Sequence, residues 1–141
     1  MRRLHLWVGG LGVVIFLITG QFMRHHQPPL VAVSEVLRLM LRSRHIYILA
    51  SALVNLMLGL YVERCPAGWR RIVQAIGSGL LIGSTALLVL AFVVEPEKGF
   101  QPEMWWSATG LYALFLGCMA HLASSIGKAR LNMERNAAGK S

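Results

Sequence analysis

Five histidines carry most of the chain's capacity for metal or proton chemistry, and they fall into two groups. His25 and His26 follow each other at the end of one apolar run, and His45 begins the next one. His5 and His121 lie near the other ends of the first and last apolar runs. Paired histidines on facing helices hold b-type haem in membrane bundles, so all five are candidate cofactor-binding residues.

The spacing of the histidines favours a simpler interpretation than haem. His5 and His25 are 20 residues apart, roughly 30 Å of helix, so both fall near lipid headgroups. His121 falls within the hydrocarbon, with Gly117 and Ala113 on the same helical face. Small residues beside a histidine leave room for a porphyrin, but equally for close packing with a hydrogen bond between helices. We therefore predict packing and no cofactor, with haem b as the alternative and proton handling as a further one.

Other metal and catalytic patterns are weak or absent. Met23 with His25 and His26 offers ligands that suit copper, but no second Met–His cluster stands nearby in the sequence, so no metal site is predicted. Cys65 and Cys118 form no CxxC pair, and we expect no disulfide between them. The chain contains no Walker loop, GxSxG or HExxH motif, and no carboxylate pair within an apolar run. These absences disfavour a hydrolase and an ion-coupled transporter, so we expect a protein that is not an enzyme.

Asn55 is the most deeply placed polar residue of the second apolar run. It shares a helical stripe with His45, Ala52 and Gly59. An unsatisfied amide that faced lipid would cost several kcal/mol, so Asn55 is expected to point into a bundle. Hydrogen bonds between membrane helices average only about 0.6 kcal/mol, so we expect Asn55→Leu to change stability by about 1 kcal/mol or less.

Small residues mark a second kind of candidate surface, for helix packing. Ala75, Gly79 and Gly83 are spaced four residues apart, which is typical of close contact inside a bundle or against another subunit. Gly117 offers a similar small face beside His121. Gln21, near the end of the first run, is a further polar residue expected within the membrane region.

The elements that position these residues follow from composition. Hydrophobic residues make up 55% of the 141 residues and charged residues 14%, against roughly 25% charged in soluble domains. A membrane-spanning helix needs about 20 largely apolar residues, and in lipid its backbone must satisfy its own hydrogen bonds. The sequence therefore predicts one all-α membrane domain over residues 1–141, a bundle of four transmembrane helices at about 4–23, 45–62, 72–94 and 104–125.

The segment of about residues 30–43 has a different pattern. Glu35, Arg38 and Arg42 form one stripe of a helix, and apolar residues fill the rest. This is typical of an amphipathic helix, and Pro28 and Pro29 precede it. We predict an interfacial helix that lies on the bilayer between the first two spans, in preference to an extension of the second span.

The charge of +8 is explained by a membrane setting rather than by nucleic acid. The basic residues lie at the ends of apolar runs, which is the usual flanking pattern of membrane helices. Counting Lys and Arg gives nine on the side of the two termini, including the basic tail 126–141, and five on the other side. Since cytoplasmic loops carry the excess, both termini are predicted to be cytoplasmic.

Residues 5–26 and 42–61 resemble a group of small bacterial four-helix membrane proteins. The resemblance covers about the first half of the chain and places Arg44, His45 and Asn55 in the most similar stretch. It implies no activity, ligand or cofactor and does not choose between the functional hypotheses.

We expect a non-enzymatic accessory or structural subunit of a membrane complex, whose partners are the bilayer and other membrane subunits or its own copies. One alternative is a b-type haem electron carrier that uses the histidines. Another is an oligomeric channel or small carrier lined by Asn55, Gln21 and the serines of the third span.

Overall fold

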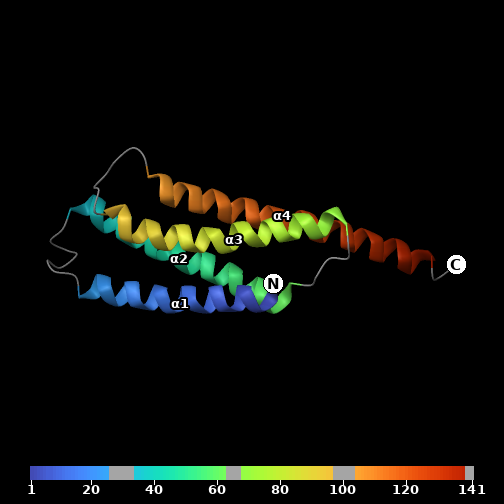
Figure 1. The fold of residues 1–141 in the computed structure, drawn as a ribbon, viewed down its shortest axis with the longest axis horizontal. Coiled ribbons are helices and arrows are strands. Elements are labelled where there is room, and N and C mark those ends of the chain that lie inside the picture. The colour runs from blue at the N-terminus through green and yellow to red at the C-terminus, as the bar shows by residue number, and fades with distance from the viewer. Residues whose placement is uncertain (26–33, 63–67, 97–103, 139–141) are drawn as a thin grey trace.

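The computed structural model describes residues 1–25, 34–62, 68–96 and 104–138, with side chains as far as residue 125 in the last range. These residues form α1 (Arg2–Arg24), α2 (Glu35–Tyr61), α3 (Trp69–Val94) and α4 (Trp105–Ala138). Successive helices run in opposite directions, so α1 begins on the side of the bundle toward which α4 runs (Figure 1). Each helix contains a stretch long and apolar enough to cross a membrane, which confirms the predicted all-α, multi-pass bundle.

The bundle is built from two tight hairpins, α1 with α2 and α3 with α4. Glycines let the backbones approach within each hairpin. A Cβ placed at Gly9 of α1 would lie 2.7 Å from the backbone nitrogen of Leu56 in α2. In the other hairpin, a Cβ at Gly77 would lie 3.1 Å from the carbonyl oxygen of Gly117. Both contacts are with backbone, so a larger residue at Gly9 or Gly77 would push the two helices apart.

The two hairpins meet mainly where α2 packs against α3. The apolar core lies at this contact and contains Leu41, Ile48, Leu88 and Phe92, of which Ile48 and Leu88 are fully buried. Buried polar side chains lie along the same helices on either side of these two residues. We call the side where α1 begins the N-terminal end of the bundle, and the other side the opposite end (Figure 1).

The predicted interfacial helix is not present as a separate element. Within the described residues, the chain from Glu35 onward forms the first turns of α2, and the Ser34 hydroxyl caps the helix by accepting the backbone N–H of Leu37 at 3.3 Å. Met40 and Leu41 are buried in the protein rather than laid on a membrane surface. The structure therefore shows the alternative, an extension of the second span; residues 30–33 lie outside the described residues.

Candidate functional site

Asn55 is the centre of a buried polar cluster that joins three helices near the N-terminal end. Its amide nitrogen donates to the carbonyl oxygens of Ser51 at 3.0 Å and Leu81 at 3.3 Å, and to the hydroxyl of Thr85 at 3.1 Å. Its amide oxygen lies 2.6 Å from Nδ1 of His5. Because these partners come from α1, α2 and α3, Asn55 ties both hairpins together.

The hydrogen bonds of Asn55 determine which nitrogen of His5 carries the proton. Two carbonyl oxygens face one end of the Asn55 amide, so that end must be the NH₂ group and the other end must be the oxygen. His5 Nδ1 therefore donates, and Nε2 keeps its lone pair. That nitrogen is buried without a hydrogen-bond partner, in a side chain that is 0% exposed. An unsatisfied buried acceptor costs roughly 1–3 kcal/mol.

His121 of α4 approaches His5 across the bundle. The centroids of the two imidazole rings lie 6.1 Å apart, and the ring planes are inclined at 78°. His121 Nε2 also lies 3.2 Å from the Ser78 hydroxyl on α3. The structure thus brings together the two histidines grouped by sequence. It places the His5 side chain inside the protein, where it is fully buried.

His45 belongs to a separate polar contact toward the opposite end. Thr19 donates its hydroxyl hydrogen to Phe16 O at 3.0 Å, so its oxygen accepts from Nδ1 of His45 at 2.9 Å. The Phe16 ring stacks on the His45 ring at a centroid distance of 4.0 Å. His45 is therefore held on α1 by a bond and a stacking contact.

The remaining histidines of the predicted outer group do not join His45 in a described contact. His25 is exposed, and its Nδ1 donates to the carbonyl oxygen of Gln21 on its own helix at 3.0 Å. Gln21 is itself exposed on α1. His26 lies outside the described residues, so the possible copper set of Met23, His25 and His26 is not described as a whole.

Arg44 and Glu95 form a buried ion pair that sequence reasoning missed. Arg44 Nε lies 2.6 Å from Glu95 Oε2, and both residues are almost fully buried. Glu95 Oε1 accepts the backbone N–H of Ser107 at 3.0 Å, in the first turn of α4. The guanidinium also lies 3.2 Å from the Met104 sulfur. Neither residue stands out in the sequence as half of a buried pair, because each lies at the edge of an apolar run.

The sequence signal available for this pair was the position of the two charged residues relative to the predicted spans. Arg44 precedes the second predicted span and Glu95 directly follows the third. In a bundle of alternating helices, both positions fall at the same end. The pKa of Glu95 responds to the contact: burial opposes its ionisation, but the Ser107 N–H and the Arg44 guanidinium outweigh this and hold the pKa below its ordinary value.

The glycines predicted to form packing faces divide into two kinds. Gly117 is packed against α3, as described above. Gly79 and Gly83 are exposed, and a Cβ built at either one meets nothing within 4 Å. These two glycines therefore do not pack inside the bundle. Of the two predicted uses, packing in the bundle or contact with another subunit, only the second is left for them.

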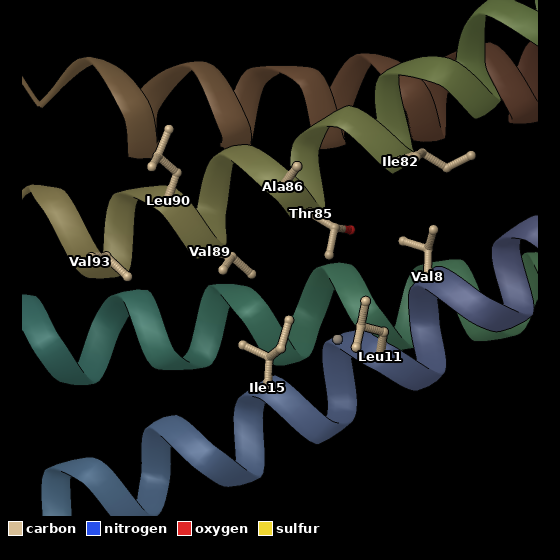
Figure 2. A pocket seen from close by; sticks show the side chains of 10 residues that line it. Val8, Leu11, Ile15, Ile82, Thr85, Ala86, Val89, Leu90 and Val93 are labelled. Atoms are coloured by element: carbon tan, nitrogen blue, oxygen red, sulfur yellow. The ribbon is translucent and has the colours of Figure 1, made fainter.

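An apolar groove runs along the seam between α1 and α3. Figure 2 shows Val8, Leu11 and Ile15 of α1 across from Val89 and Val93 of α3. The groove has a volume of about 590 Å³, and the hydroxyl of Thr85, the polar group in its wall, already accepts from Asn55. No histidine lines the groove, so its chemistry is that of a hydrocarbon-facing surface.

No three His, Cys, Asp or Glu side chains gather into a metal-binding group within the described ranges. Cys118 is a free, half-buried thiol, and Cys65 lies outside the described residues. Comparison with known protein families, with curated proteins and with solved structures finds no match for this chain.

Proposed function

We propose that this chain is a small, non-enzymatic accessory or structural subunit of the bacterial inner membrane, and that a transmembrane helix of another chain packs on α3. The observation that carries this proposal is the open face at Gly79 and Gly83, where a Cβ meets nothing within 4 Å. The two glycines are four residues apart on a membrane-spanning helix. That spacing is typical of close helix–helix contact in lipid.

The contrast with six other helical glycines supports this use of α3, although Gly10 of α1 is open in the same way. Gly9, Gly12, Gly59, Gly77, Gly110 and Gly117 all face a neighbouring helix within the chain. Gly79 and Gly83 have the same character but face outward, between the exposed apolar side chains of Ile76 and Leu90. A partner helix that packed here would gain van der Waals contact with no desolvation of polar groups.

The interior of one chain favours this role over conduction. Ile48 and Leu88 are both fully buried between the polar cluster of Asn55 and the Arg44–Glu95 pair. A polar solute that moved through the middle of the bundle would have to displace this apolar contact. An oligomeric channel between chains remains an alternative, and it would use the same α3 face.

The test is association in the membrane, measured by crosslinking that does not depend on cysteine and by co-purification from native membranes. Gly79→Ile and Gly83→Ile should reduce the crosslinked or co-purified fraction at least several-fold. Gly10→Ile is the matched control, because a Cβ at Gly10 also meets nothing within 4 Å but Gly10 lies on α1. Equal association of all four proteins would overturn the proposal.

We propose further that both termini are cytoplasmic, as the excess of nine Lys and Arg residues over five indicates. A cysteine at Lys98, in a background without Cys65 and Cys118, should react with a membrane-impermeant thiol reagent in intact cells with a permeabilised outer membrane. A cysteine at Lys140 should be protected. The reverse pattern would invert the orientation.

A further inference from the structure

We propose that His5 and His121 bind one d-block metal centre between their imidazole rings. This site is separate from the α3 face and does not depend on association with another chain. The centre would take Nε2 of His5 and one ring nitrogen of His121, so that a ligand from each hairpin holds it.

His5 is already prepared as a metal ligand. Metal-binding histidines commonly donate their other ring N–H to a fixed acceptor, which sets the tautomer and the ring orientation. Asn55 performs this role, because its amide oxygen accepts from Nδ1 of His5 at 2.6 Å. The two hydrogens of the Asn55 nitrogen are shared among three acceptors, which keeps that oxygen in place. The Nε2 lone pair is left buried and without a partner.

The separation of the rings suits a metal held by two imidazoles. A point midway between the centroids lies half of 6.1 Å from each ring. A ring nitrogen lies about 1.1 Å from its centroid, as C–N bonds of about 1.33 Å require. A metal about 2 Å from a nitrogen of each ring therefore requires both nitrogens to turn toward the space between the rings, whose planes are inclined at 78°. If Nε2 is the nitrogen used, His121 has only to exchange its 3.2 Å contact with Ser78 for the metal.

Two neutral imidazoles define the class of the centre. Imidazole suits copper, zinc and iron. A metal that binds its two protein ligands on opposite sides needs no third ligand from the protein. A copper(I) ion and a haem iron both have this property. Asn55 bonds to Leu81 O and Thr85 of α3 beside the two rings. These bonds hold α2 against α3 next to His5, so a bare ion would disturb this packing less than a porphyrin would.

The experiment is a measurement of metal and haem content on the full chain in mild detergent, followed by titration with copper(I) under reducing conditions and with zinc. The wild-type protein should hold one metal centre per chain. His5→Gln and His121→Gln should each lower the affinity by at least about 100-fold. Asn55→Leu should lower it by about 10–100-fold, as for other residues that orient a metal-binding histidine.

His45→Gln is the matched control, since His45 is a membrane-helix histidine bonded to Thr19 rather than to the pair. It should retain full binding. Copper bound without a Soret band would identify a bare ion, and a Soret band lost in both glutamine variants would identify haem iron. Circular dichroism and gel filtration exclude variants that fail to fold, and His5→Asn and His121→Asn replace them. No stoichiometric centre in the wild-type protein, or equal loss with His45→Gln, would overturn the proposal.

Discussion

The guanidinium of Arg44 lies 2.6 Å from the carboxylate of Glu95, and this contact joins α2 to the end of α3 and the start of α4. Arg44 belongs to α2, Glu95 directly follows α3, and the second carboxylate oxygen accepts the Ser107 N–H in the first turn of α4. Met104, the residue before α4, offers no side-chain oxygen for this purpose. Glu95 therefore caps α4 from another helix, in addition to pairing with Arg44.

We expect removal of the Glu95 carboxylate to be strongly destabilising. Glu95→Ala leaves a buried guanidinium without its counter-charge, and changes of this kind cost about 3–5 kcal/mol. Glu35→Ala is the control, because Glu35 is exposed and its carboxylate makes only a long contact, 3.9 Å, with the Arg38 guanidinium. It should cost about 0.5 kcal/mol or less. Reversible unfolding in mixed detergent measures both.

The double variant Arg44→Met with Glu95→Leu tests whether the cost comes from the unpaired charge. It should recover most of the stability lost in Glu95→Ala, because a buried ion pair can often be replaced by apolar residues. A double variant as unstable as Glu95→Ala would show that the cap on Ser107 matters more than the pair.

The stability of the protein should fall on acidification, and Glu95 should account for part of the change. Its pKa is lower in the folded protein than the ordinary value of 4.5. Stability from this group is therefore complete above about 4.5 and is lost as pH falls through the folded-state pKa. Unfolding measured from pH 6 downward should show a smaller acid dependence in Glu95→Gln than in the wild-type protein. An identical dependence would contradict this assignment.

The four spans were predictable because length and hydropathy determine them, whereas the surface helix was not. Glu35, Arg38 and Arg42 correctly mark one polar stripe of a helix. Periodicity shows which residues share a face, but not what covers the opposite face. The structure covers part of it with protein, since Leu41 belongs to the same core cluster as Phe92 of α3.

The candidate site was predictable in its residues but not in its contacts. His121 and Asn55 were identified from their types and depths, and His5 from its type and its place at the same end of the chain's bundle as His121. The sequence does not fix how far each helix is rotated, so it could not join His5 to Asn55. Arg44 and Glu95 were missed because each was interpreted alone, at the edge of its own span.

Glycine packing within the first hairpin predicts opposite outcomes at two adjacent positions. A Cβ at Gly9 would lie 2.7 Å from the Leu56 backbone nitrogen, whereas a Cβ at Gly10 meets nothing within 4 Å. Gly9→Ala should therefore cost about 1–3 kcal/mol. Gly10→Ala should be neutral or stabilising by up to about 1 kcal/mol, because alanine favours helix. Thermal unfolding of the two variants measures these costs. Similar costs for both would contradict this packing.

Asn55→Leu should destabilise the protein by about 1–3 kcal/mol, more than its position in the chain alone suggests, because it leaves the buried Nδ1–H of His5 without an acceptor. Ser51→Ala is the control: Ser51 is equally buried on α2, but its hydroxyl donates to Ile48 O on its own helix. It should cost about 1 kcal/mol or less. Adding His5→Leu to Asn55→Leu should cost less than the two single changes together, because the unpaired donor is then gone. Strict additivity in a double-mutant cycle would show that His5 and Asn55 do not depend on each other.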